Sequence, residues 1–212
     1  MWDRTTVLVV AIMYLAWAKI LFADETVYVL DYIFRIACLI VLFRAFEWRE
    51  VLAWPERRWR AVLLTVLMIY LLIAAQQARH LAETFYPELF IGRFPYLEYG
   101  PLKLFDLTAG LALVAASEEM VFRYAFARAW LQRGGGVWGL YLASSLAFGI
   151  LHAPQGISAV VDAFVGGLIF MFLYRRTGSL WPSMLAHYLV NFLIFSGLGC
   201  PYGMGGCRPD MM

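Results

Sequence analysis

The chain consists mostly of apolar runs close to the length that crosses a lipid bilayer, joined by short links. A membrane-spanning helix needs about 20 mostly apolar residues. Seven runs meet or approach this length: 5–23, 27–46, 59–80, 103–132, 137–152, 157–174 and 179–198. The sequence therefore predicts an all-α fold, a polytopic transmembrane helical bundle of about seven spans.

The amino-acid composition agrees with an integral membrane protein that forms one domain. Of the 212 residues, 63% are hydrophobic and 15% are charged, whereas about a quarter of the residues in soluble domains are charged. The high hydrophobic content indicates that the lipid bilayer surrounds the chain. The net charge of +2 is too small to indicate nucleic acid as a partner. The compact size favours a bacterial inner membrane. We divide the single domain, 1–212, into N-terminal helices with an outer loop (1–102), a motif-bearing core (103–198) and a glycine-rich tail (199–212).

Arginine residues in the links predict the orientation of the bundle, because cytoplasmic loops are enriched in Lys and Arg. The 47–60 link, the end of the fourth run and the pair Arg175–Arg176 are basic, whereas the 22–27 link carries Asp24 and Glu25. This alternation predicts that the N-terminus lies inside. Segment 81–102 then lies outside, where its aromatic residues and prolines suit a lid or an interfacial hairpin.

Glu118, Glu119 and Arg123 lie within an apolar run, where ionisable side chains are unfavourable unless they have a partner or a function. Glu119 and Arg123 are four residues apart, the spacing of an intrahelical ion pair. Neighbouring helix positions point about 100° apart, so Glu118 and Glu119 are not expected to face one partner. Glu118 is therefore the candidate general base, because removal from water strengthens a carboxylate as a base.

Three further polar residues lie in the fifth and seventh runs. His152 ends the fifth run, whereas His187 and Asn191 are four residues apart in the seventh and share a helix face. Taken singly, each is well explained by packing, because buried His and Asn residues commonly join membrane helices by hydrogen bonds. Taken together with Glu118, they favour a functional site.

Two other sets of residues have ordinary structural explanations. Asp31 and Arg35 are four residues apart in the second run and have the spacing of a self-neutralising pair. Cys38 lies in an apolar run and is expected to be a packing residue. Cys200 and Cys207 flank the glycine-rich tail, where a disulfide and two free thiols both remain open.

Three motifs occur in order along the C-terminal half. Residues 118–123 read Glu-Glu-x-x-x-Arg, residues 148–152 read Phe-x-x-x-His, and residues 187–191 read His-x-x-x-Asn. This ordered set resembles the CPBP family of intramembrane proteases, which includes CAAX prenyl endopeptidases and bacterial relatives linked to peptide maturation and self-immunity. The resemblance covers about residues 105–195.

The resemblance implies an intramembrane endopeptidase that acts on a membrane-tethered peptide or protein. In the family pattern the first glutamate of the pair, here Glu118, takes a proton from a water that His152 helps to hold. His187 and Asn191 stand where the family places its oxyanion donors, which stabilise the negative charge that develops on the peptide carbonyl. Structural support is expected from Glu119, Arg123 and Phe148.

Three other interpretations remain open. Glu118, His152 and His187 also form a familiar zinc set with a fourth position for water. No HExxH sequence is present, which favours the metal-free glutamate mechanism without a cofactor. Buried ionisable residues also occur in proton-coupled carriers, although no internal repeat is visible. An immunity protein without activity is the third interpretation, and the intact motifs count against it.

Overall fold

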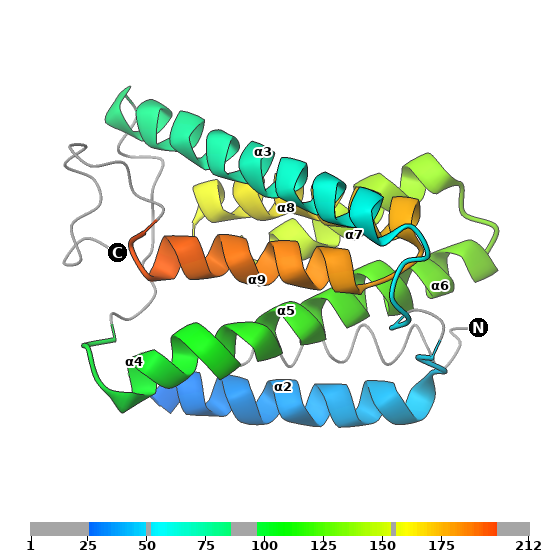
Figure 1. The fold of residues 1–212 in the computed structure, drawn as a ribbon, viewed down its shortest axis with the longest axis horizontal. Helices are drawn as coiled ribbons and strands as arrows, with labels where there is room; N and C mark the ends of the chain where they lie inside the picture. Colours follow the sequence, from blue (N-terminus) through cyan, green and yellow to red (C-terminus); the bar gives the residue numbers. More distant parts are fainter. Residues whose placement is uncertain (1–25, 50–51, 86–96, 154–155, 199–212) are drawn as a thin grey trace.

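The computed structural model describes residues 26–49, 52–85, 97–153 and 156–198, and this part of the chain contains helices and no strand (Figure 1). The all-α prediction is confirmed for these residues. The helices are α2 (Thr26–Ala45), α3 (Arg58–Phe85), α4 (Pro101–Phe105), η3 (Asp106–Gly110), α5 (Leu111–Glu119), η4 (Met120–Ala125), α6 (Phe126–Gln132), α7 (Val137–Leu151), α8 (Ile157–Thr177) and α9 (Trp181–Phe195).

Six of the seven predicted spans coincide with these helices, and the first span, 5–23, lies outside the described residues. The tail that holds Cys200 and Cys207 also lies outside them, as do residues 86–96 of the predicted outer loop. By length and composition, α3 and α8 are long and apolar enough to cross a membrane. The count of seven spans and the orientation of the N-terminus stay predictions.

The fourth predicted span is one continuous helical path from α4 to α6, interrupted by two π-helical segments (Figure 1). The first segment, η3, precedes α5, and the second, η4, begins directly after Glu119. A π turn inserts an extra residue into an α-helix and is frequent at functional sites. The two glutamates therefore lie on a short α-helical segment, α5, with a change of helical register at each end.

Helix packing places α5 between two other helices. One neighbour is α2, which runs alongside α5, and the other is α9, which also packs against α3 and α8 (Figure 1). Polar side chains of α5 can therefore meet residues of both the N-terminal and the C-terminal parts of the chain.

Small residues let α7 and α8 approach each other closely. A Cβ atom added at Gly167 would lie 2.9 Å from Cβ of Ser145, and one added at Gly149 would lie 2.8 Å from the carbonyl oxygen of Val160. Close backbone approach at small residues is typical of membrane helix pairs. Gly178, with φ of 68°, then ends α8 in the left-handed conformation that glycine adopts without strain.

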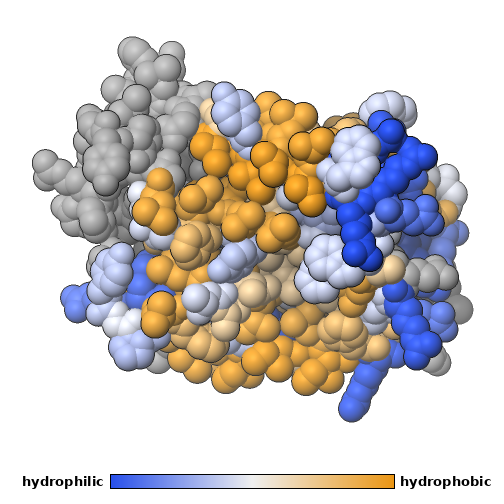
Figure 2. Space-filling view, in the orientation of Figure 1, coloured by the Kyte–Doolittle hydropathy of each residue, from blue (hydrophilic) through white to orange (hydrophobic). Residues whose placement is uncertain are grey.

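On the face shown in Figure 2, the surface is apolar over most of the length of the molecule and hydrophilic at one end. Exposed arginines make this end basic. The basic end is the one where α2, α6 and α8 finish and α3 begins. Its exposed arginines are Arg44, Arg49, Arg57, Arg58, Arg60, Arg128, Arg133, Arg175 and Arg176. This separation of apolar and basic surface is the pattern expected of a bundle with one end at a cytoplasmic membrane face.

Candidate active site

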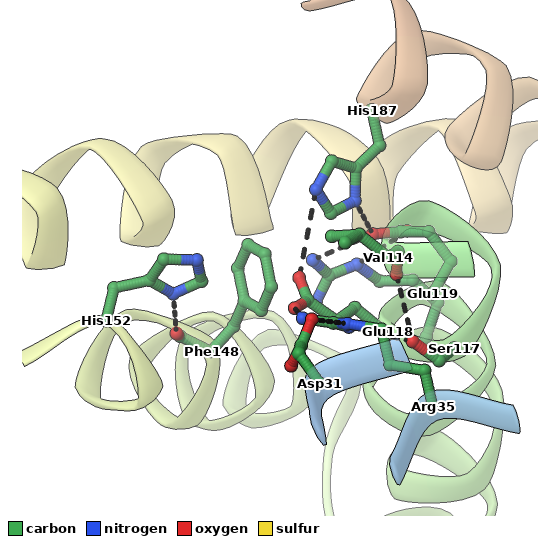
Figure 3. A network of polar contacts seen from close by, with 10 residues as sticks. Asp31, Arg35, Val114, Ser117, Glu118, Glu119, Phe148, His152 and His187 are labelled. Atoms are coloured by element: carbon green, nitrogen blue, oxygen red, sulfur yellow. Dashed lines mark hydrogen bonds and ion pairs between the residues drawn. The ribbon is translucent and has the colours of Figure 1, made fainter. Parts of the chain in front are cut away.

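Glu118 lies at the contact between α5 and two neighbouring helices, and only 6% of its surface is exposed. Its Oε1 accepts a hydrogen bond of 2.8 Å from Nη2 of Arg35 on α2. Its Oε2 lies 3.8 Å from Nε2 of His187 on α9 (Figure 3). One oxygen of the carboxylate is thus held by a cation, and the other faces an imidazole.

His187 connects the two glutamates through its two ring nitrogens (Figure 3). Its Nδ1 lies 3.0 Å from Oε1 of Glu119, while its Nε2 faces Glu118. An ionised carboxylate only accepts hydrogen bonds, so Nδ1 carries the hydrogen, and a neutral ring then has its lone pair on Nε2. The expectation that Glu118 and Glu119 do not face one partner is wrong, because a bifunctional imidazole meets each of them with a different atom.

The ring of His187 is also held by aromatic contacts. Phe170 of α8 stacks on it with a centroid distance of 4.8 Å and an interplanar angle of 13°. Phe148 of α7 approaches it edge-on at 5.8 Å. Together with the bond to Glu119, these contacts leave the imidazole little freedom to rotate away from Glu118.

Glu119 and Arg123 form the ion pair that their spacing predicts, and neither side chain is exposed. Nε of Arg123 lies 3.0 Å from Oε2 of Glu119, and Nη1 lies 3.4 Å from the hydroxyl of Ser144 on α7. The guanidinium also lies over Phe148 at 4.7 Å and over Phe170 at 5.6 Å. A buried cation is tolerated here because a carboxylate and aromatic faces surround it.

Arg35 is a site residue that the sequence interpretation did not include. Beyond its expected contact with Asp31 at 2.6 Å, it donates to the hydroxyl of Ser117 and to Glu118, at 2.8 Å in each case. Arg35 and Glu118 are 83 residues apart in the chain. Only the spacing of Asp31 and Arg35 was visible in the sequence, and that signal identifies a local pair without showing what else the arginine binds.

His152 lies on the far side of Phe148 from the glutamates (Figure 3). Its Nδ1 is 2.9 Å from the backbone oxygen of Phe148, and the two rings meet edge to face at 4.8 Å. With Nδ1 donating to this carbonyl, a neutral His152 has Nε2 as an acceptor. The arrangement therefore brings His187 to Glu118 directly, whereas Phe148 stands between Glu118 and His152.

Asn191 lies one turn beyond His187 on α9 and is partly exposed. Among the described residues, its amide has no hydrogen-bond partner. The side chain thus has hydrogen-bonding capacity beside the buried cluster. This placement suits a group that binds a substrate, although Asn191 is not joined to the cluster itself.

By distance alone, one water could bridge a base and a second acceptor in the cluster. Two atoms 3.8 Å apart, as are Oε2 of Glu118 and Nε2 of His187, can both accept from a water about 2.8 Å from each. A water that donates both hydrogens in this way has its lone pairs directed outward, as a nucleophile requires. Among the described residues, no three His, Cys, Asp or Glu side chains are grouped so that they could share a metal ion.

Comparison with known proteins gives one match. Residues 100–193 match a family model described as Rce1-like, type II CAAX prenyl endopeptidase. The matched range includes both glutamates, both histidines and Asn191, and it excludes α2 with Arg35. No curated protein and no solved structure matches the chain.

Proposed function

Because this chain belongs, through residues 100–193, to the Rce1-like family of type II CAAX prenyl endopeptidases, we propose that it cleaves membrane-tethered peptides or proteins with a water activated by Glu118. The observation that carries the proposal is the buried carboxylate of Glu118, which faces Nε2 of His187 at 3.8 Å. The apolar helices and the family support an integral membrane protein. A hydrolytic site in such a protein needs a base that is shielded from lipid, which the contacts of Glu118 supply.

In the proposed reaction, the water oxygen attacks the carbon of the scissile peptide bond while one of its protons passes to Glu118. The carbonyl oxygen becomes an oxyanion, and the amide of Asn191 donates a hydrogen bond to it. The carbon–nitrogen bond then breaks, and the proton held by Glu118 moves to the leaving nitrogen. Nε2 of His187 accepts a hydrogen bond from the water and orients it, so in this scheme His187 is not the oxyanion donor that the family resemblance implies.

His152 has a more distant place in this scheme than the family resemblance implies. Its Nδ1 donates to the carbonyl oxygen of Phe148, so Nε2 of a neutral ring is a hydrogen-bond acceptor. The ring of Phe148 lies between it and Glu118 (Figure 3). We therefore propose that Phe148 turns aside when a substrate enters, and that His152 then contacts the same water.

The proposed mechanism is metal-free. The two oxygens of Glu118 already face a guanidinium and an imidazole, and a cation in contact with a ligand opposes the binding of a metal ion by charge repulsion. The proposed setting is a bacterial inner membrane with the basic end of the molecule at the cytoplasmic face, supported by the nine exposed arginines of that end.

The proposal is tested with purified protein in liposomes. The probe is a quenched fluorescent peptide that ends in a farnesylated cysteine followed by three residues. The wild-type protein should release the fluorophore, and Glu118→Gln should be slower by about 10²–10⁴ while its thermal unfolding stays close to that of the wild type. Glu56→Gln, which alters an exposed glutamate in the link before α3, is the matched control. Cleavage by Glu118→Gln at the wild-type rate would refute the assignment of the base.

A further inference from the structure

Arg35 links the N-terminal part of the chain to the proposed catalytic carboxylate. It lies on α2, which is outside the range that matches the family model, and 7% of its surface is exposed. Three of its nitrogens donate to three different side chains: Nε to Asp31, Nη1 to Ser117 and Nη2 to Glu118. A planar guanidinium with three fixed bonds has one allowed orientation, which makes it a rigid support for the groups it binds.

The remaining contacts of this support are also directional. The hydroxyl of Ser117 donates to the backbone oxygen of Val114, so its lone pairs are available to accept from Arg35. Ser117 precedes Glu118 in the chain, and both lie on α5. Arg35 therefore forms hydrogen bonds to two neighbouring side chains of α5. These bonds fix Oε1 of Glu118 and leave Oε2 directed at His187.

We propose that Arg35 is a positioning residue that holds Glu118 ionised and directs its Oε2 toward the water shared with His187. The inference rests on the proposed function, in which Glu118 is the base. A carboxylate in an apolar environment favours its protonated form, and a protonated carboxyl cannot take a proton from water. A guanidinium 2.8 Å away opposes this effect, because a neighbouring positive charge favours the ionised carboxylate.

Several other charged or titratable groups lie around Glu118, and none of them replaces Arg35. Glu119 is adjacent and adds a negative charge, while Arg123 is already in contact with Glu119. His187 approaches from α9 and has its Nδ1 bound to Glu119. The groups near Glu118 on α2 are Asp31, Arg35 and Cys38. Of these groups, Arg35 is the cation that touches the carboxylate.

A purely structural role is the competing explanation, because Arg35 also neutralises Asp31. The double variant Arg35→Gln/Asp31→Asn separates the two roles, since it removes the cation together with its partner on α2. Arg35→Lys keeps the charge without the planar fork. Asp31→Asn is the matched control, because it removes a contact of Arg35 and leaves the contact with Glu118 in place.

The measurement is kcat/KM as a function of pH, with thermal unfolding recorded for each variant. In Arg35→Gln and in the double variant, the acidic limb of the profile should move to higher pH by about 1–3 units, with activity partly regained at alkaline pH. Arg35→Lys should keep the limb near its wild-type position and lower kcat. A double variant that folds and has the wild-type profile would overturn the proposal, because Arg35 would then serve only Asp31.

Infrared spectroscopy tests the same inference without cleavage, so failure of the proposed function is recognised separately. The signal is the carbonyl stretch of a protonated Glu118. The band is assigned to Glu118 if it disappears when Glu118→Gln is added to the variant that shows it. At neutral pH, this band should appear in the double variant and be missing from the wild type and from Asp31→Asn. If the wild type cleaves nothing but the band follows this order, the role of Arg35 stands and the protease assignment fails. A band that is missing from the double variant refutes the role of Arg35.

Discussion

Replacement of Arg123 by alanine should destabilise the protein strongly, because it leaves the buried carboxylate of Glu119 without its cation. Neither side chain is exposed, and the pair is closed by contacts of 3.0 and 3.4 Å. Removal of one member of a buried ion pair costs about 3–5 kcal/mol. The rings of Phe148 and Phe170 add cation–π stabilisation, but contacts within one network do not add independently. The expected loss of unfolding free energy therefore remains about 3–5 kcal/mol.

Thermal unfolding in detergent measures this loss. For a chain of this size, about 2–4 °C of melting temperature corresponds to 1 kcal/mol, so Arg123→Ala should unfold about 6–20 °C below the wild type. Arg128→Ala is the matched control, because Arg128 is exposed on the following helix, α6. The control should change the unfolding free energy by no more than about 0.5 kcal/mol. The burial argument is wrong if Arg123→Ala and Arg128→Ala unfold at the same temperature.

A double variant extends the prediction from stability to activity. Glu119→Leu/Arg123→Met replaces the whole pair by apolar side chains, an exchange that is often neutral or stabilising in a protein interior. Its melting temperature should return toward that of the wild type. Turnover should stay low, because Glu119 also binds Nδ1 of His187 at 3.0 Å and orients the ring. Recovery of both properties would show that Glu119 has no part in the reaction beyond balancing Arg123.

Three further predictions concern the reaction and the packing. Asn191→Ala should lower kcat by about 10²–10³ and leave KM nearly unchanged, because an oxyanion donor acts mainly in the transition state; steady-state kinetics decide this, and an effect confined to KM contradicts it. Protein treated with a chelator should still cleave, and elemental analysis should find less than one zinc per chain; activity that is lost and then restored by zinc would contradict the metal-free mechanism. Gly167→Ala should lower the unfolding free energy by about 1–3 kcal/mol, because its Cβ would lie 2.9 Å from Cβ of Ser145. The control is the neighbouring Gly166→Ala, whose Cβ has its nearest contact at 3.5 Å and which should be tolerated in the same unfolding assay.

Features that depend on short stretches of sequence were predictable. The helices follow from apolar runs, and the described ones coincide with the spans expected for them. The ion pair of Glu119 and Arg123 follows from a spacing of four residues, although the π-helical segment η4 that contains Arg123 did not show in the sequence. Local periodicity specifies which side chains share a face. It does not specify where the helical register shifts.

Contacts between distant helices were not predictable in the same way. Nothing in the pattern around Glu118 indicates that α2 is its neighbour, because the choice of neighbouring helices is made by packing of the whole bundle. The pairing of Arg35 with Glu118 and the contact of Phe148 with His187 both depend on that choice. The contact of His187 with both glutamates was missed for a different reason. Two glutamates on different faces of one helix can be reached by the two nitrogens of a single ring.

Charge balance gives a physical reason why this cluster should act as a base. Its ionisable side chains, joined by the described contacts, are three carboxylates, two guanidiniums and one imidazole: Asp31, Glu118, Glu119, Arg35, Arg123 and His187. With His187 neutral, these six side chains sum to one net negative charge, and a net charge is unfavourable in an apolar interior. Uptake of one proton from water makes the cluster neutral, so the surroundings favour the transfer that hydrolysis requires. Arg35 opposes this uptake at Glu118 itself, because its guanidinium lies 2.8 Å from Oε1 and favours the ionised carboxylate.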